Sequence, residues 1–351
     1  MAKNASVLRQ LLGEVETRIV DLYEAFTGGT AKTAFDRAGS LFEGWTAEGL
    51  IKRVAGWAKA VENVDVDTLK GLKLVLDGLI ETYKDAARRR SKGEYEVDEF
   101  GLDEGFLDLA RPLFVFLYRK WWRVTTVGIE NVPKEGGALL VANHSGVLPW
   151  DGAMVATAMW ADAPQPRVVR TLHLDWFTQL PYVATLMLRT GQVLACPENA
   201  ERLLKGGHLA AVFPEGVKGV GKLLKDRYKL ARFGRGGFVK VALRSHAPII
   251  PVSIVGAEEI YPNLMRVDWL GKPIGAPYMP ITPTWPWFGL LGLVPLPTKW
   301  TIEFGKPIDT SKFRERDAEN FLVVQQLTNQ VRDEIQATIT KHVLRRESVF
   351  W

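Results

Sequence analysis

The chain of 351 residues contains a single cysteine, Cys196, and only five histidines. One cysteine excludes an intrachain disulfide, and a reducing compartment is the natural interpretation. We assign Cys196 to packing rather than chemistry. The first 26 residues carry charges throughout and lack the apolar core of a signal peptide. No apolar run reaches the roughly 18 residues of a spanning helix, so we expect neither a secretory signal nor a membrane span.

Extremes of composition are also missing. The chain is 47% hydrophobic and 24% charged, with a net charge of +5 and a pI of about 9.1. These values indicate a globular protein and exclude disordered and collagen-like classes. The length suffices for one large domain with an accessory segment, or for two domains.

The chain divides into two parts that differ in pattern. Residues 1–95 repeat apolar residues at three- and four-residue spacing, which predicts amphipathic helices. Residues 91–105 are acidic and contain glycine, as in a linker. We therefore expect a helical amino-terminal segment over 1–105 and a second domain over 106–351 that ends in a long helix.

Short β-rich runs alternate with helical runs after residue 136. The predicted buried strands are 137–143, 166–172, 191–195, 208–214, 247–256 and 299–305. The predicted helices are 151–160, 176–189, 198–206, 238–245 and about 313–344. This alternation predicts an α/β fold with a mostly parallel or mixed central sheet flanked by helices.

Two polar groups follow predicted strands and are expected to share one edge of the sheet. His144 follows the strand 137–143, and Glu215 follows 208–214; ligands in such sheets bind at the carboxyl ends of strands. A histidine there can act as a general base if a carboxylate orients its ring. Asp151 can be that carboxylate if Gly146 and Pro149 fold the loop back, and it would also cap the next helix. The alternative is an ordinary loop histidine beside an N-cap.

A turn with free backbone N–H groups follows the strand 208–214, and it can bind an anion or a hydroxyl. A basic run comes next, with one acid, Asp226, among nine cations. These cations are Lys218, Lys222, Lys225, Arg227, Lys229, Arg232, Arg235, Lys240 and Arg244. The run is either a solvated helical face or a site for phosphate, on a substrate or on membrane lipid.

Together these blocks resemble the glycerolipid acyltransferase family, the bacterial 1-acylglycerol-3-phosphate acyltransferases and their relatives. Asn143, His144 and Asp151 match that family's Asn-His-x4-Asp block. Residues 213–216, Phe-Pro-Glu-Gly, match its third block, and PIIPVSIVG, residues 248–256, matches its Pro-rich strand. The resemblance covers roughly residues 110–310, in the same order.

The resemblance implies a mechanism without a serine or cysteine nucleophile, a metal or a cofactor. His144, oriented by Asp151, would deprotonate a glycerolipid hydroxyl, which would attack the acyl thioester of acyl-CoA or acyl-ACP. Glu215 and Gly216 would position the acceptor. The expected substrate-binding residues are Asn143, Ser145, Phe213, Pro214, Glu215, Gly216, Lys218 and Arg227.

Three features depart from the family pattern. Six residues separate His144 from Asp151 instead of four, and the extra two fall in a Gly/Leu/Pro loop that can bulge. Pro197 stands where the second block has arginine, with Arg202 the nearest cation. Lys218 replaces the third block's arginine and lacks its bidentate fork. The last two points resemble the subgroup nearer to acylglycerol acyltransferases and count against a phosphorylated acceptor. The resemblance to the whole family implies lysophosphatidate or a related lipid as the acceptor, and a neutral glyceride is the alternative.

Two aromatic segments are candidates for contact with a membrane. Residues 282–297 are uncharged and too short and Pro-interrupted to span a bilayer. Trp285, Trp287 and Phe288 would anchor this segment in the interface, unless it is a buried covering loop. Residues 114–124 form either an interfacial helix or a core helix. A lipid acceptor implies a cytoplasmic protein, peripheral on the inner membrane face, and no nucleic-acid partner is expected.

Two other functional classes remain. A lipid-ester hydrolase using the same His/Asp pair would need a nucleophile or a metal, and the chain has neither G-x-S-x-G nor H-E-x-x-H. A non-catalytic lipid-binding protein could keep the fold, and the longer His144–Asp151 spacing permits it. The presence of both His144 and Glu215 favours the enzyme.

Overall fold

The computed structural model describes residues 77, 88–89, 92–93, 96–174, 183–271, 278–287 and 292–350. The helices predicted within residues 1–95 therefore lie almost wholly outside the described residues. The predicted helix 176–189 is described only in its second half, as α7 (Val183–Arg189).

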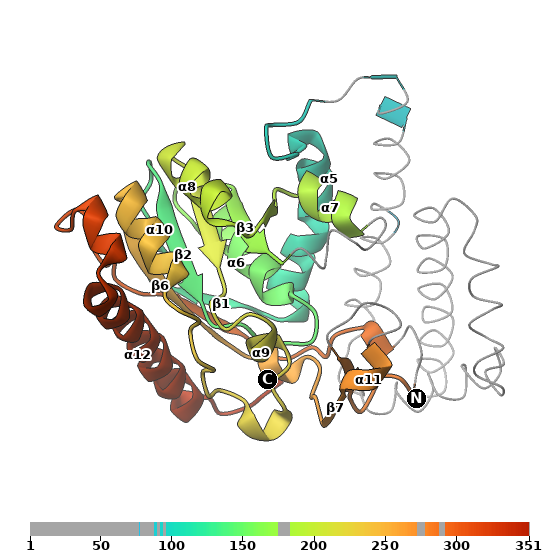
Figure 1. Cartoon of the computed structure of the whole chain (residues 1–351). Helices are drawn as coiled ribbons and strands as arrows, with labels where there is room; N and C mark the ends of the chain where they lie inside the picture. Colours follow the sequence, from blue (N-terminus) through green and yellow to red (C-terminus); the bar gives the residue numbers. More distant parts are fainter. Residues whose placement is uncertain are drawn as a thin grey trace, which may run out of the picture.

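A seven-stranded sheet forms the centre of the described chain (Figure 1). In spatial order its strands are β1 (Thr125–Val127), β9 (Thr301–Phe304), β6 (Ile249–Val255), β2 (Ala138–Ala142), β5 (Leu209–Val212), β3 (Val169–His173) and β4 (Val193–Leu194). The five strands from β6 to β4 run parallel, whereas β9 is antiparallel to β6, and β1 runs parallel to β9. The mixed sheet confirms the predicted fold class.

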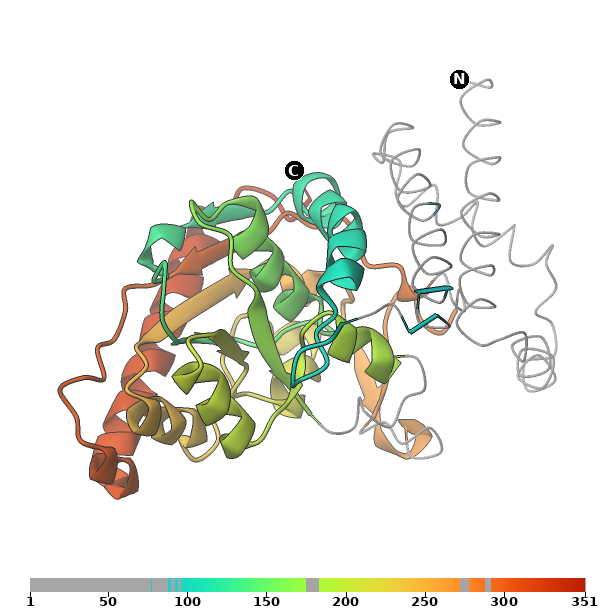
Figure 2. The same cartoon turned by 90° about the horizontal axis from the view of Figure 1, so that it is seen from above.

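Helices cover both faces of this sheet, as Figures 1 and 2 show. One face carries α5 (Glu104–Phe116), the π-helical turn η1 (Leu117–Trp121) and α6 (Trp150–Ala161). The other carries α8 (Pro197–Lys205), α10 (Gly237–Ser245) and α12 (Phe321–Arg345). Side chains of β2 alternate between them: Leu140 packs in the first core and Leu139 in the second. Burial on both faces explains the continuous apolar runs of the parallel strands.

Several short elements have no clear sequence signal. They are the turns η2 (Ile129–Asn131), η4 (Leu224–Asp226), η5 (Ala257–Glu259) and η8 (Glu315–Glu319), the helices α9 (Val217–Val220) and α11 (Asp268–Gly271), and the two-stranded sheet of β7 (Met265–Val267) and β8 (Met279–Ile281). The last helix was predicted from Phe313, but α12 begins eight residues later. Asn320 ends η8 and caps α12, because its side chain accepts the N–H of Leu322.

Residues 114–124 pack on the core, so the interfacial-helix alternative is wrong for Tyr118, Trp121 and Trp122, whereas Phe114 and Phe116 are half-buried. Tyr118, Trp121 and Trp122 are buried. The indole N–H groups of Trp121 and Trp122 donate to the carbonyls of Pro295 and Leu296, at 3.0 and 3.1 Å. These contacts satisfy the polar end of each indole inside the protein, which leaves neither ring free for a bilayer.

Residues 96–103, which precede α5, are attached to the α/β domain by ion pairs. Asp98 pairs with the buried Arg170 of β3, and Asp103 pairs with Arg189 of α7 at 2.6 Å. Burial alone would raise the pKa of Asp98, but Arg170 and two backbone N–H groups outweigh it and hold that pKa below its usual value. The acidic stretch predicted as a linker is thus anchored here by its charges.

Candidate active site

Asn143 fixes the end of β2 from which the site projects. Its side chain is fully buried, and it exchanges two hydrogen bonds with the backbone of Ile254 on β6. The Nδ2 atom donates to the carbonyl at 3.0 Å, and Oδ1 accepts the N–H at 2.7 Å. Asn143 was predicted to contact substrate; the structure instead gives it the role of tying two neighbouring strands together.

His144 and Asp151 form a close pair despite their long spacing. His144 Nδ1 lies 2.6 Å from Asp151 Oδ2, the imidazole is 14% exposed, and the carboxylate is fully buried. Gly146, with φ of +82°, allows the turn that brings the loop back. The two residues extra to the family pattern are therefore absorbed in the loop, and the expected pairing of His144 with Asp151 forms.

Asp151 is not the N-cap of its helix, which corrects the sequence interpretation. Helix α6 begins at Trp150 after Pro149, so Asp151 lies in the first turn. Its Oδ2 also accepts the N–H of Ser145 at 2.8 Å, and Oδ1 accepts the N–H of Gly152 at 2.8 Å. A carboxylate with three donors is fixed in orientation, and it fixes the ring of His144 in turn.

The Phe-Pro-Glu-Gly turn after β5 supports His144 from the other side. The ring of Phe213 packs against the imidazole, with centroids 4.6 Å apart. Glu215 Oε1 accepts the backbone N–H of His144 at 2.9 Å, and its side chain is fully buried. Glu215 was predicted to open into the cleft and bind the acceptor. It points at the His144 backbone instead, so it holds His144 in place.

The short helix α9 packs directly against His144. Gly216 precedes it with φ of +55°, and Gly219 lies inside it. A Cβ atom at Gly219 would stand 2.8 Å from the Cβ of His144 and 2.7 Å from that of Glu215. The approach therefore requires glycine. Lys218 lies on the exposed surface of this helix.

The basic run is not a helical face, which corrects one of its two interpretations. Residues 221–236 form turns around η4, and only the last of the nine cations lie on α10. Arg227 is exposed, and its Nε lies 3.9 Å from Glu259. Lys222 is instead nearly buried between Glu215 and Glu258. The sequence pattern does not distinguish the nearly buried Lys222 from the exposed Arg227, because both belong to the same basic run.

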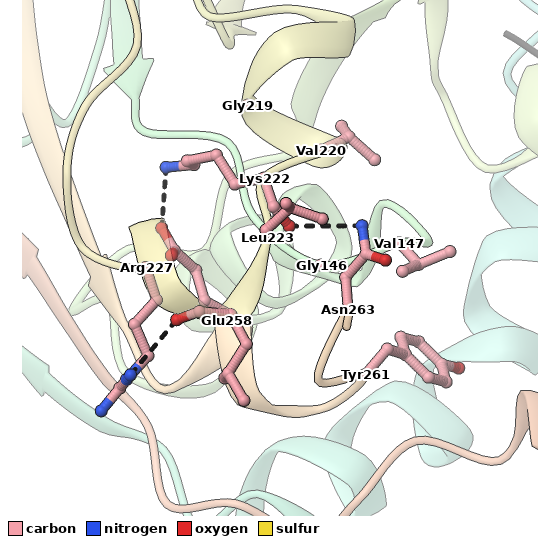
Figure 3. Close-up of a pocket in the computed structure, with 11 residues that line it drawn as sticks. Gly146, Val147, Gly219, Val220, Lys222, Leu223, Arg227, Glu258, Tyr261 and Asn263 are labelled. Atoms are coloured by element: carbon pink, nitrogen blue, oxygen red, sulfur yellow. Dashed lines mark hydrogen bonds and ion pairs between the residues drawn. The ribbon is translucent and has the colours of Figure 1, made fainter. Parts of the chain in front are cut away.

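A small cavity of about 10 Å³ lies beside the loop that carries His144 (Figure 3). Gly146 and Val147 of that loop line it, together with Lys222, Arg227 and Asn263. Figure 3 shows the amide nitrogen of Asn263 directed at the carbonyl of Lys222, at 3.3 Å. The Oδ1 atom of Asn263 is buried without a hydrogen-bond partner. The volume suffices for about one water molecule or hydroxyl group.

Among known protein families, the Acyltransferase family matches residues 123–255 of this chain. An uncharacterized protein of Mycobacterium tuberculosis is 49% identical over 265 residues, 75% of this chain and 74% of that protein. A probable 1-acyl-sn-glycerol-3-phosphate acyltransferase of Mycoplasma pneumoniae is 27% identical over 158 residues, 43% of this chain and 56% of that protein. The chain belongs to the Acyltransferase family.

Two further similarities complete the comparison. A bovine protein named DGAT1/2-independent enzyme synthesizing storage lipids is 25% identical over 226 residues, 63% of this chain and 60% of that protein. The crystal structure of the 1-acyl-sn-glycerophosphate acyltransferase PlsC from Thermotoga maritima superposes with a TM-score of 0.45 at 18% identity. It covers 70% of this chain and 84% of that one.

The hairpin of β7 and β8 gives the acyltransferase an exposed apolar surface near this site. Leu264, Met265 and Trp269 are exposed, and Asn263, which lines the cavity, precedes them in the chain. Trp287 is 57% exposed, whereas Trp285 is half-buried with its indole N–H 3.3 Å from Met279 Sδ. Phe288 lies outside the described residues.

Among the described residues, no helix has the length and apolar character needed to cross a bilayer. The same part of the acyltransferase contains no group of three or more His, Cys, Asp or Glu side chains arranged to hold a metal ion.

Proposed function

We propose that this acyltransferase moves an acyl chain from acyl-CoA or acyl-ACP to a hydroxyl of a glycerolipid acceptor, with His144 as general base. The observation that carries the proposal is the 2.6 Å contact between His144 Nδ1 and the buried carboxylate of Asp151. A carboxylate can only accept, so Nδ1 keeps its proton and Nε2 is the nitrogen that can take one.

The reaction then follows from this arrangement. Nε2 of His144 removes the proton of the acceptor hydroxyl as its oxygen attacks the thioester carbonyl carbon. Asp151 stabilises the imidazolium that forms. The tetrahedral intermediate collapses with cleavage of the C–S bond, and the imidazolium returns the proton to the leaving thiolate. The products are an ester and a free thiol, and the site residues finish unchanged.

The proposed acceptor is lysophosphatidate or a related lipid, supported by the exposed cations Lys218 and Arg227 close to the loops of the site. Phosphate binds such side chains through charge-assisted hydrogen bonds. A neutral acylglycerol is the second candidate, favoured by lysine in place of arginine at 218 and by the name of the bovine relative.

The site of action in this proposal is a membrane surface, with the enzyme peripheral on the inner face of the cytoplasmic membrane. A lipid hydroxyl lies at the bilayer surface, so the cleft must open there. The exposed side chains of the β7–β8 hairpin, next to the cavity-lining Asn263, support this orientation.

The test is consumption of a labelled acyl-CoA by wild type and His144→Ala with a panel of acceptors. The panel contains glycerol 3-phosphate, lysophosphatidate, a lysophospholipid and monoacylglycerol. Loss of the base is expected to lower turnover by about 10²- to 10⁴-fold. His208→Ala, an exposed histidine before β5 at the opposite edge of the sheet, is the matched control. Near-wild-type turnover in His144→Ala would refute the proposed mechanism.

A further inference from the structure

Three adjacent strands end beside His144, and a buried group of charges joins them. His144 follows β2, Glu215 follows β5 and Glu258 follows β6. Lys222, on the loop after α9, lies between the two glutamates. Its Nζ is 2.8 Å from Glu258 Oε1 and 3.3 Å from Glu215 Oε2. Figure 3 shows the contact with Glu258 at the edge of the small cavity.

The environment of this charge cluster, defined as Glu215, Lys222 and Glu258, keeps its cation charged. Burial alone would lower the pKa of Lys222, but the two carboxylates outweigh it and raise that pKa above its usual value. Burial raises the pKa of Glu258, against the opposing effect of Lys222. The N–H of Tyr228 donates to the second oxygen of Glu258 at 2.7 Å, so this carboxylate is also held in place.

The charge cluster reaches His144 through Glu215. One oxygen of Glu215 accepts the N–H of His144, and the other accepts the N–H of Ala231 at 2.5 Å and contacts Lys222. His144 is therefore held at two points: its backbone by Glu215 and its ring by Asp151. Any shift of the Glu215 carboxylate moves the backbone that carries the base.

Stability alone does not account for a buried ion cluster at this place. Replacing such a cluster with apolar residues of similar volume is often neutral or even stabilising. We propose that Lys222 is a positioning residue for His144, because it neutralises and immobilises the carboxylate that holds the His144 backbone. Glu258 is the second carboxylate that contacts the ammonium group of Lys222. This inference rests on the proposed function, in which His144 is the base.

The proposal fixes the sign of a pH effect. The charged groups on the elements packed against His144 are Asp151 on α6, Glu215 after β5, Lys218 on α9, and Lys222 and Glu258 behind Glu215. Removing the charge of Lys222 favours the protonated imidazole, so the acid limb of kcat/KM moves to higher pH. Removing the charge of Glu258 moves the limb to lower pH.

The first variant is Lys222→Met in the full chain, assayed for thioester consumption across pH. Displacement of the base is expected to lower kcat by about 10- to 100-fold. The KM for the thioester should stay within about twofold, because this cluster binds no part of the donor. The acid limb should rise by roughly half a pH unit, from the Coulomb effect of one charge at this range. Lys222→Arg, which keeps the charge, should return the limb to its wild-type position.

The second variant, Glu258→Gln, gives the opposite sign. The acid limb of kcat/KM of this variant should move to lower pH. Its loss of kcat should be smaller than that of Lys222→Met, because Glu215 keeps its contact with Lys222. Lys341→Met is the matched control, since Lys341 on α12 pairs with Glu303 on β9 at 2.6 Å, outside the site. Its acid limb should not move.

The outcomes separate a positioning role from a merely structural one. A structural role lowers the amount of folded enzyme, measured by circular dichroism, without moving the limb. An unchanged limb in folded Lys222→Met and Glu258→Gln, or a shift in the same direction in both, overturns the inference. If Lys222→Met does not fold, Glu258→Gln decides by whether its limb falls. An active His144→Ala variant would instead overturn the proposed function on which this inference rests.

Discussion

At the residue scale, the site depends on the burial and bonding of Asp151. Its two oxygens accept from His144 Nδ1 and from the backbone N–H groups of Ser145 and Gly152. Because each oxygen accepts a backbone N–H, neither position can hold an amide nitrogen without two donors meeting. Asparagine is thus a poor substitute here in either orientation of its side chain.

Asp151→Asn is therefore expected to lower kcat by about 10²- to 10⁴-fold, through misorientation of His144, while remaining less damaging than His144→Ala. It should also cost about 1–3 kcal/mol of unfolding free energy, because buried donors lose their acceptor. Thioester turnover and urea unfolding measure the two effects.

The control for this variant is Asp162→Asn. Asp162 follows the other end of α6 and accepts from Tyr118 at 2.6 Å, away from His144. It should keep wild-type turnover. Full activity in Asp151→Asn would show that another group orients the base.

At the element scale, the decisive feature is the approach of α9 to the end of β2. Parallel pairing of β2 with β5 and β6 brings three strand ends to one edge. The turn after β5 then lays α9 against His144, and Gly219 is the residue at the contact. The backbone of a four-residue helix thus sets the space available to His144.

Gly219→Ala should damage catalysis more than its size suggests. The new Cβ would lie 2.8 Å from the Cβ of His144 and 3.0 Å from its carbonyl oxygen, so the base must move. A displacement of about 1 Å is expected to lower kcat by about 100-fold, and overpacking to cost about 1–3 kcal/mol. Turnover and thermal unfolding test this.

Gly237→Ala is the matched glycine control. It lies at the start of α10, where an added Cβ would meet nothing within 4 Å. It should leave turnover unchanged and should be neutral or slightly stabilising. Equal turnover in the Gly219 and Gly237 variants would contradict the role given to α9.

At the scale of the whole molecule, apolar exposure is concentrated in more than one place. Trp269 on α11, between β7 and β8, is 69% exposed, and Trp287, six residues after β8, is 57% exposed. Phe321 and Leu322 are exposed at the start of α12. Figures 1 and 2 place α12 and the hairpin on opposite sides of the described chain. Of these two described surfaces, the one at β7 and β8 continues from Asn263, which lines the cavity.

The double variant Trp269→Ser/Trp287→Ser should reduce binding to anionic phospholipid vesicles at high salt by about tenfold or more, because buried indole area anchors independently of charge. At low salt the basic residues of 218–235 should retain part of the binding, since each contributes about 1 kcal/mol that salt screens. Sedimentation with vesicles measures both.

Phe321→Ser/Leu322→Ser removes comparable exposed apolar area from the opposite side and should bind vesicles as wild type does. If the hairpin variant binds at high salt as well as this control, the hairpin is only a covering loop. The membrane contact must then be sought elsewhere in the chain.

The sequence by itself determined the features that are local. Apolar runs placed the five parallel strands from β6 to β4, because strands covered on both faces are mostly apolar. The positions of His144 and Glu215 after two of those strands placed both at one edge. The Asn-His and Phe-Pro-Glu-Gly blocks, read together, gave the family. Short elements such as β1 and β7 were missed because a run of three residues carries too little pattern.

Tertiary structure decided what each polar side chain does. Glu215 meets the His144 backbone across 71 residues, and Lys222 meets Glu258 across 36. No local pattern marks such pairs, because they depend on where loops from separate strands converge. Burial reversed other expectations: Trp121 and Trp122 are core residues although they stand beside basic ones. Composition gives a side chain's capacity for an interaction, but only packing selects the partner.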